Sequence, residues 1–227
     1  MVEIEAGIAP DGAAIAPFLM DKHEVSNKDY FDFVSAGGYG ERKYWPEILI
    51  IDGLSVSWDQ AARKLVDKTG IPAPRIWSGG RYPEGREFHP VVGISWYEAN
   101  AYANWKGKDL PGWHQWWQAA LAGEDLVFPW GNDIKTTSSR ANFGFKGTQT
   151  VGSYPLGVSP YGCLDMAGNV REWLRESRSS PELRTIVGGS WRDPVYMFEA
   201  VHAESFKPDF AAEDIGFRCV KAVTSKR

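Results

Sequence analysis

The stretch Gly168-Asn169-Val170-Arg171-Glu172-Trp173 opens the segment that decides the fold of this chain, residues 168–219. Two further blocks follow it, Val187-Gly188-Gly189-Ser190-Trp191 and Ile215-Gly216-Phe217-Arg218-Cys219. Glycine and tryptophan recur in these blocks at intervals too irregular for one face of a helix. Because glycine lets the backbone turn sharply or approach another strand closely, we expect short strands joined by tight loops.

Three blocks upstream extend this pattern over most of the chain. They read Met20-Asp21-Lys22-His23-Glu24-Val25-Ser26-Asn27, His89-Pro90-Val91-Val92-Gly93-Ile94-Ser95-Trp96-Tyr97-Glu98-Ala99 and Phe128-Pro129-Trp130-Gly131-Asn132. Together with the segment 168–219, they resemble the formylglycine-generating enzyme family, also called sulfatase-modifying factors. The resemblance implies an α+β, C-type-lectin-like fold with short strands and a few helices. It also implies a single domain over residues 1–227, with an insertion at about 39–88.

The insertion at about 39–88 points to one subgroup of that family. Together with the later segment Asp193-Pro194-Val195-Tyr196-Met197-Phe198, it resembles the domains that are fused to bacterial serine/threonine kinases. No kinase motif occurs in the chain itself. The resemblance therefore implies a module of a bacterial signalling protein that has no kinase activity of its own.

Capping signals place the expected helices. Ser26 is predicted to cap the first one, because its hydroxyl can accept a hydrogen bond from a free amide of the first turn. Ser57 and Ser95 each open a capping-box pattern, which predicts helices that end near Gly70 and Gly107. Eleven tryptophans are many for this length. We attribute most of them to the packing of an irregular core.

Composition excludes several classes of function. With 25 basic and 29 acidic residues, the formal net charge of -4 gives no broad attraction to nucleic acid or to an anionic membrane. No run of about 18 apolar residues occurs, so membrane insertion is not expected. The first residues do not resemble an export signal, which predicts a cytoplasmic protein. The two cysteines, Cys163 and Cys219, are then structural thiols.

The residues that would carry the family's oxidative chemistry are absent. The resemblance implies a copper(I) site made of two cysteine thiolates, which follow the serine of the Gly-Gly-Ser block by three and eight residues. Counted from Ser190, these positions are Asp193 and Phe198. A carboxylate and a phenyl ring cannot replace two soft thiolates, so we expect neither copper nor the family's oxidation. The four histidines are scattered and show no metal-binding spacing.

The resemblance also implies a structural calcium site beside the first block. Carried over by position, its ligands are the side chains of Asp165 and Glu172 and the backbone carbonyls of Gly168 and Val170. Hard oxygen ligands of this kind suit calcium. In the alternative, Glu172 only accepts hydrogen bonds from loop amides and Asp165 only shapes a polar turn. We favour calcium.

The family places its ligand-facing surface between the Gly-Gly-Ser-Trp and Gly-Phe-Arg blocks. This segment offers aromatic faces and polar tips, a mixture that suits recognition. The candidate ligand-binding residues are Trp191, Arg192, Asp193, Tyr196, Phe198 and His202. We expect a copper-free pocket bounded by Trp191, Asp193 and Phe198. The alternative for the tryptophan is that it packs the corner after the Gly-Gly-Ser turn.

Three functions fit these observations. The leading hypothesis is a non-catalytic ligand-binding or sensory module, whose partner is an unknown protein or small molecule. The second is a binding protein diversified by a retroelement, because such proteins use the same fold and vary in the same segment. The third is a divergent oxidoreductase or maturation factor with an altered site.

Overall fold

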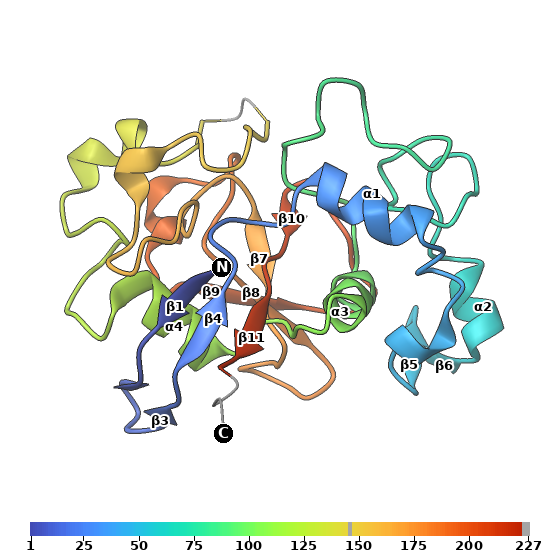
Figure 1. Ribbon diagram of the computed structural model, residues 1–227, viewed down its shortest axis with the longest axis horizontal. Helices are drawn as coiled ribbons and strands as arrows, with labels where there is room; N and C mark the ends of the chain where they lie inside the picture. The colour runs from blue at the N-terminus through green and yellow to red at the C-terminus, as the bar shows by residue number, and fades with distance from the viewer. Residues whose placement is uncertain (145–146, 224–227) are drawn as a thin grey trace.

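The computed structural model of the protein describes residues 1–144 and 147–223 (Figure 1). A three-stranded sheet joins the beginning and the end of this described chain. Its central strand, β4 (Phe18–Met20), pairs antiparallel with both β1 (Val2–Ile4) and β11 (Val220–Ala222). β11 begins directly after Cys219, so its pairing with β4 determines where the last sequence block enters the core.

The three blocks of the segment 168–219 meet in a four-stranded sheet of order β10-β7-β8-β9. Its strands are β7 (Arg171–Trp173), β8 (Arg184–Val187), β9 (Ala203–Phe206) and β10 (Ile215–Gly216). β10 runs parallel to β7, whereas the other neighbours are antiparallel. Glu172 lies opposite Gly216 on one side and Val187 on the other, so the first block contacts both of the others. The short strands that the sequence predicts are confirmed.

Helices begin where the capping signals place them. The three longest are α1 (Asn27–Ser35), α3 (Trp96–Trp105) and α4 (Trp113–Leu121). Ser26 caps α1, and Ser95 caps α3 by a capping box in which its amide lies 2.7 Å from the Glu98 carboxylate. At α4 the cap is Gly112, which has no side chain to offer, and Glu176 accepts the Trp113 amide at 2.7 Å instead.

The predicted insertion forms a hairpin and two short helical segments. They are η1 (Arg42–Tyr44), β5 (Leu49–Ile51), β6 (Leu54–Val56) and α2 (Trp58–Ala62). The hairpin turns at Asp52 and Gly53, whose φ angles are 55° and 81°. Two successive positive φ angles are what a two-residue hairpin turn of type I′ requires.

The helix predicted to run to Gly70 is wrong in length, because α2 ends at Ala62. A loop centred on Asp67 replaces its second half. The Asp67 carboxylate accepts the amides of Ile71 at 3.1 Å and Gly80 at 2.7 Å, together with those of Thr69. An aspartate that bonds nearby amides in this way competes with the helical hydrogen bonds.

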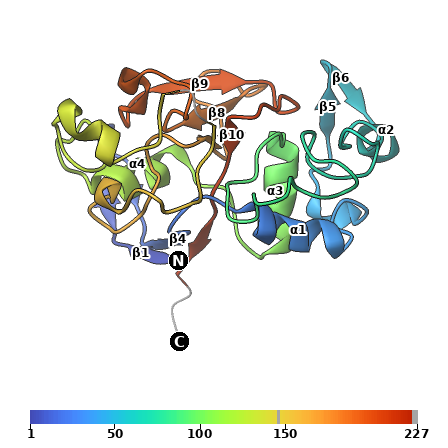
Figure 2. The same cartoon turned by 90° about the horizontal axis from the view of Figure 1, so that it is seen from above.

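The elements are arranged around β7 and β10. Figures 1 and 2 show α1, α3 and the hairpin β5–β6 on one side of these strands, and β1, β4 and α4 on the other. Seven of the eleven tryptophans are buried, and Trp77, Trp116 and Trp173 are fully so, which confirms the packing role assigned to most of them. The remaining short elements are β2 (Gly7–Ile8), β3 (Ala14–Ile15), η2 (Ile134–Ser139), η3 (Pro155–Gly157) and η4 (Val195–Phe198).

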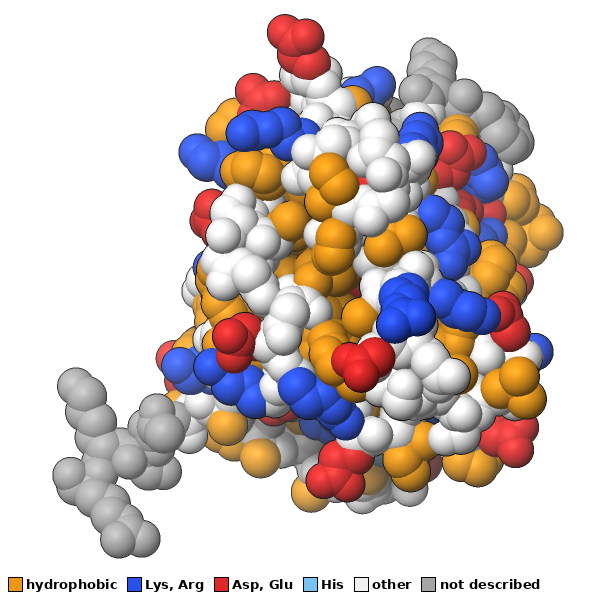
Figure 3. All heavy atoms as spheres, turned by 90° about the vertical axis from the view of Figure 1, so that its right-hand side faces the viewer, with side chains coloured by type: hydrophobic (Ala, Val, Ile, Leu, Met, Phe, Trp, Pro, Cys, Tyr) orange, Lys and Arg blue, Asp and Glu red, His pale blue; other side chains and the backbone are white. Residues whose placement is uncertain are grey.

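The surface over the insertion is mixed in character. Figure 3 shows apolar side chains scattered among charged ones on this face. Three apolar residues at the hairpin are exposed there, Ile48, Ile50 and Leu54. None of the helices that the structure describes is long and apolar enough to span a bilayer.

Candidate functional site

A buried ion pair joins the first and the last of the three sequence blocks. Nε of Arg218 lies 3.0 and 2.8 Å from the two carboxylate oxygens of Glu172, and Nη2 lies 2.7 Å from Oε1. Both side chains are almost completely buried. The Trp116 indole donates to Oε2 of the same carboxylate at 3.0 Å. Both oxygens of Glu172 are therefore engaged by groups of the core.

The remaining donors of Arg218 are satisfied by backbone carbonyls. Nη1 donates to the carbonyls of Asp21 and Lys22, and Nη2 donates to those of Leu164 and Asp165. A buried charge is tolerated when its partner and its hydrogen bonds are all in place. This arginine thus ties the last block to the loop before β7.

A second buried carboxylate, Glu24, lies close to the predicted calcium ligands. It is 1% exposed, and its Oε1 accepts a hydrogen bond from the Asn169 side chain at 3.0 Å. Its Oε2 has no hydrogen-bond partner among the described residues. Burial, reinforced by the charge of Asp165, raises the pKa of Glu24 well above its usual range. Sequence analysis missed this residue, although it stands two positions before the Ser26 cap.

Asp165 occupies the turn where the sequence places it. Its φ is 54°, and its carboxylate accepts the Gly152 amide at 2.5 Å. Burial raises the pKa of Asp165 despite that hydrogen bond. Glu24 and Asp165 thus offer hard oxygen atoms of the kind that calcium prefers. The Glu172 carboxylate is less suited, because Arg218 and Trp116 already occupy it.

The backbone between these acids turns tightly. Gly168 and Asn169 both have positive φ, at 80° and 59°. At Gly168 a Cβ atom would lie 2.6 Å from the Asn142 carbonyl, so only glycine fits there. Within the described chain, no three His, Cys, Asp or Glu side chains converge on one point. A cation at this turn would therefore depend on backbone carbonyls such as those of Gly168 and Val170, and its binding stays a prediction.

Asp193 and Phe198, which stand at the positions that the resemblance assigns to the family's copper ligands, are both buried. Asp193 is 6% exposed, and its Oδ2 accepts the Ser190 amide and hydroxyl, both at 2.8 Å. Its Oδ1 forms an ion pair with Arg171 of β7. Arg171 also lies 3.3 Å from Asp214, which comes just before β10. Asp193 is therefore part of a charged network inside the protein.

Phe198 fills the other position with packed apolar surface. It is fully buried in a cluster with Phe128, Ala141 and Ala167. Gly189 is pressed against it so closely that a Cβ atom would lie 2.4 Å from the ring. The predicted pocket bounded by Trp191, Asp193 and Phe198 is therefore wrong, because the last two side chains face the interior.

Trp191 instead borders a different hollow. This hollow has a volume of about 240 Å³, and its walls include Arg86, His89 and Glu213. Nε1 of Trp191 has no hydrogen-bond partner within the described residues. The guanidinium of Arg192 lies 4.7 Å from the centre of the indole ring and forms an ion pair with Glu213.

His89 lines the same hollow. Its Nδ1 lies 3.1 Å from Nη1 of Arg86 and 3.0 Å from the Thr148 hydroxyl. Because a guanidinium can only donate, Nδ1 accepts, and the neutral ring carries its proton on Nε2. Burial, together with the charge of Arg86, lowers the pKa of His89, which favours this neutral form.

The other two candidate ligand-binding residues lie together. Tyr196 is 61% exposed, and its ring centre lies 6.4 Å from that of the half-buried His202. The six candidates are thus divided between the Trp191 hollow, the interior and this pair.

Comparison with known proteins identifies the family of the chain and supports its fold. The sequence pattern of the family described as "Sulfatase-modifying factor enzyme 1-like domain" matches residues 3–223. The chain belongs to this family. Its α+β, C-type-lectin-like fold is confirmed by solved structures, among them Treponema denticola variable protein 1. That structure aligns with a TM-score of 0.69 and 17% identity, over 98% of this chain and 94% of its own.

Two curated relatives of this sulfatase-modifying-factor domain are similar in sequence. The chain is 32% identical to serine/threonine-protein kinase pkn1 of Chlamydia pneumoniae, over 91% of this chain and 33% of the relative. It is 30% identical to inactive C-alpha-formylglycine-generating enzyme 2 of Bos taurus, over 90% of this chain and 77% of the relative. The chain thus spans about a third of the length of the kinase relative, in agreement with the subgroup resemblance.

Proposed function

We propose that this sulfatase-modifying-factor domain is a non-catalytic ligand-binding module. The observation that carries the proposal is the contrast between neighbours in one loop. Asp193 and Phe198 are part of the interior, whereas Trp191, in the same segment, borders a hollow and its indole N–H has no acceptor among the described residues. The scaffold has lost the positions for soft metal ligands but keeps a concave surface beside them.

The chemistry of the Trp191 hollow favours a small group that accepts hydrogen bonds. Trp191 and His89 supply N–H donors, and Arg86 adds a positive charge. The hollow has a volume of about 240 Å³, slightly below the usual range of ligand pockets, which starts at about 300 Å³. This size suits a small amide or carboxylate, including one carried by a side chain of a partner protein.

The test uses ¹⁹F NMR of protein labelled with 5-fluorotryptophan. The resonance that disappears in Trp191→Phe belongs to Trp191 and should shift on titration with N-acetylglycine amide or acetate. The resonances of the fully buried Trp77 and Trp173 should stay in place. Trp191→Phe itself should melt within a few degrees of the wild type, because an aromatic ring remains at this partly exposed position.

A catalytic function would give a different result. The purified protein would then convert the cysteine of a Cys-x-Pro-x-Arg peptide into formylglycine in the presence of copper(I) and oxygen, which mass spectrometry detects. That product would overturn the non-catalytic proposal. If the Trp191 resonance did not move on titration with N-acetylglycine amide or with acetate, the proposed binding site would be wrong.

We further infer that the module serves a larger bacterial signalling protein. The inference is supported by the match to a kinase relative of which it spans about a third. An antibody raised against the domain should detect, in the cells of origin, a protein much longer than 227 residues. A native product of this length alone would contradict the inference.

We also propose a structural calcium ion at the turn that carries Asp165. Support comes from the charge balance, because Glu24, Asp165 and Glu172 are buried acids near one buried cation, Arg218. Asp165 would bind the ion together with the carbonyls of Gly168 and Val170. Glu172 would hold this turn through Arg218.

A further inference from the structure

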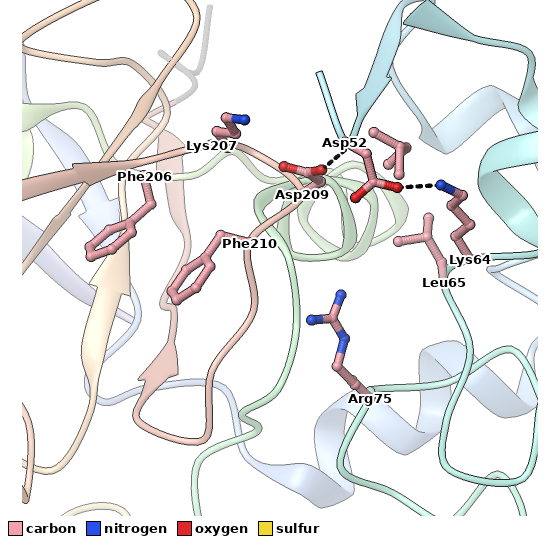
Figure 4. A pocket seen from close by; sticks show the side chains of 9 residues that line it. Asp52, Lys64, Leu65, Arg75, Phe206, Lys207, Asp209 and Phe210 are labelled. Atoms are coloured by element: carbon pink, nitrogen blue, oxygen red, sulfur yellow. Dashed lines mark hydrogen bonds and ion pairs between the residues drawn. The ribbon is translucent and has the colours of Figure 1, made fainter. Parts of the chain in front are cut away.

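A second hollow lies between the insertion and the end of β9. Its volume is about 430 Å³, and it is larger than the hollow at Trp191. The two share no lining residue, so they are separate sites. Figure 4 shows its walls, which include Arg75 and Lys207 on one hand and the rings of Phe206 and Phe210 on the other.

The charges around this hollow are only partly paired. Lys64 forms an ion pair with Asp52, and the Asp52 amide donates to Asp209 at 2.6 Å. Neither Arg75 nor Lys207 has an ion-pair partner in the described part of the chain. The lining cations outnumber the lining acids, so the hollow is positive overall. An anion entering it would be attracted and not repelled.

The guanidinium of Arg75 is placed to receive such an anion. Figure 4 shows it projecting into the space between Phe210 and Lys64. The Arg75 amide donates to the Gly93 carbonyl at 2.9 Å, which anchors the residue at the edge of the core. Arginine binds a carboxylate through two parallel N–H donors, so an exposed arginine without an ion-pair partner among the described residues suits this group.

The opposite wall is aromatic. The rings of Phe206 and Phe210 are stacked with their centres 4.7 Å apart and an angle of 13° between them. Phe210 is nevertheless 39% exposed. Because Phe206 covers one face of Phe210, a ligand ring can pack against its uncovered side and remove apolar surface from water.

We propose that this hollow binds a small aromatic carboxylate. The carboxylate lies on Arg75, with Lys207 adding charge, and the aromatic ring packs against Phe210. The volume lies within the range of about 300–1,000 Å³ that is usual for small-molecule sites. The site goes beyond the function proposed for the Trp191 hollow and does not depend on it.

The experiment is an isothermal titration of the full 227-residue chain with phenylacetate. Two control probes separate the contributions. Acetate has the charge without the ring, and 2-phenylethanol has the ring without the charge. Phenylacetate should bind saturably, and each control should bind at least about tenfold more weakly, a difference that corresponds to about 1.4 kcal/mol.

Variants then test the two walls. Arg75→Gln keeps the length of the side chain and loses its charge, and Phe210→Leu keeps an apolar side chain and loses the flat ring. Each should weaken phenylacetate binding by about tenfold or more. Arg63→Gln is the matched control, because Arg63 is an exposed arginine of the same insertion that does not line the hollow. Trp191→Phe should also bind like the wild type.

Three results would overturn the proposal. One is the absence of saturable phenylacetate binding up to about 10 mM, beyond the millimolar range of weak specific complexes. Another is binding by Arg75→Gln that equals that of the wild type while both proteins melt alike. The third is equally strong binding of 2-phenylethanol, because the carboxylate would then contribute nothing.

Discussion

At the scale of single residues, Arg218 links several segments of the interior through its hydrogen bonds. Its guanidinium is fully buried and meets the Glu172 carboxylate and a ring of backbone carbonyls. A buried ion pair resembles a hydrophobic contact of the same shape in net stability, but removal of one partner leaves the other charge uncompensated. Glu172 therefore has a structural role that precedes any part it plays in binding a cation.

Glu172→Ala should lower the free energy of unfolding by about 3–5 kcal/mol, because Arg218 would stay buried without its counter-charge. Urea denaturation followed by circular dichroism measures the loss. Glu182→Ala serves as the control, since Glu182 is an exposed acid of the β7–β8 loop and should change stability by less than about 0.5 kcal/mol. Equal stability of the two variants would contradict the assigned role of Glu172.

Calcium is better tested at Asp165, because Asp165→Asn keeps a residue that tolerates positive φ. A ligand that binds only the folded state stabilises it by about 2.7 kcal/mol at a hundredfold excess over its dissociation constant. Calcium should therefore raise the melting temperature of the wild type and of the exposed-site control Asp125→Asn, but not that of Asp165→Asn. A wild type that melts identically in calcium and in chelator rules the ion out.

At the scale of elements, side chains decide where the chain leaves regular structure. Asp67 is the clearest case, because a single carboxylate accepts amides from three residues and so holds the loop after α2. Burial alone would raise the pKa of Asp67, but the hydrogen bonds from Gly80, Thr69 and Ile71 lower it to about 2. The folded state therefore favours the charged form.

This pKa predicts an acid-dependent stability. A lowered pKa stabilises the fold above the unfolded value of 3.8, and the contribution is lost as pH falls toward 2. Asp67→Asn should thus be about 1–2 kcal/mol less stable than the wild type at pH 7, and the gap should close between pH 4 and pH 2. Urea denaturation at a series of pH values measures this gap. A gap that stays constant over the series would mean that the charge is not what holds the loop.

Sequence reasoning succeeded where a local pattern has one structural solution. The capping serines Ser26 and Ser95 predict the helix starts, because a hydroxyl satisfies the free amides of the first turn wherever it occurs. It failed at the end of α2, where the contacts that stop the helix come from as far away as Gly80. It also failed for Asp193, because its partner Arg171 lies on β7, far from this loop in the sequence.

At the scale of the whole molecule, one apolar cluster connects segments far apart in sequence. Phe198 packs with Phe128, Ala141 and Ala167, so it joins the loops before the first block to the connection between β8 and β9. Phe198 therefore anchors the candidate ligand-facing segment to the interior. Tyr196 of the same short helix, η4, is exposed. A buried and an exposed aromatic side chain thus lie two positions apart in the same segment.

Phe198→Ala should therefore destabilise the whole chain and not a binding site. Loss of a buried phenyl ring leaves a cavity and costs about 3–5 kcal/mol. Because the cluster joins segments that precede β7 to one that follows β8, unfolding should remain a single transition shifted to lower urea concentration. Tyr196→Ala is the matched control from the same helix, and its 61% exposed side chain predicts a change below about 0.5 kcal/mol. If Phe198→Ala unfolded at the same urea concentration as the wild type, the ring would not be packed. The pocket expected between Trp191, Asp193 and Phe198 would then have to be reconsidered.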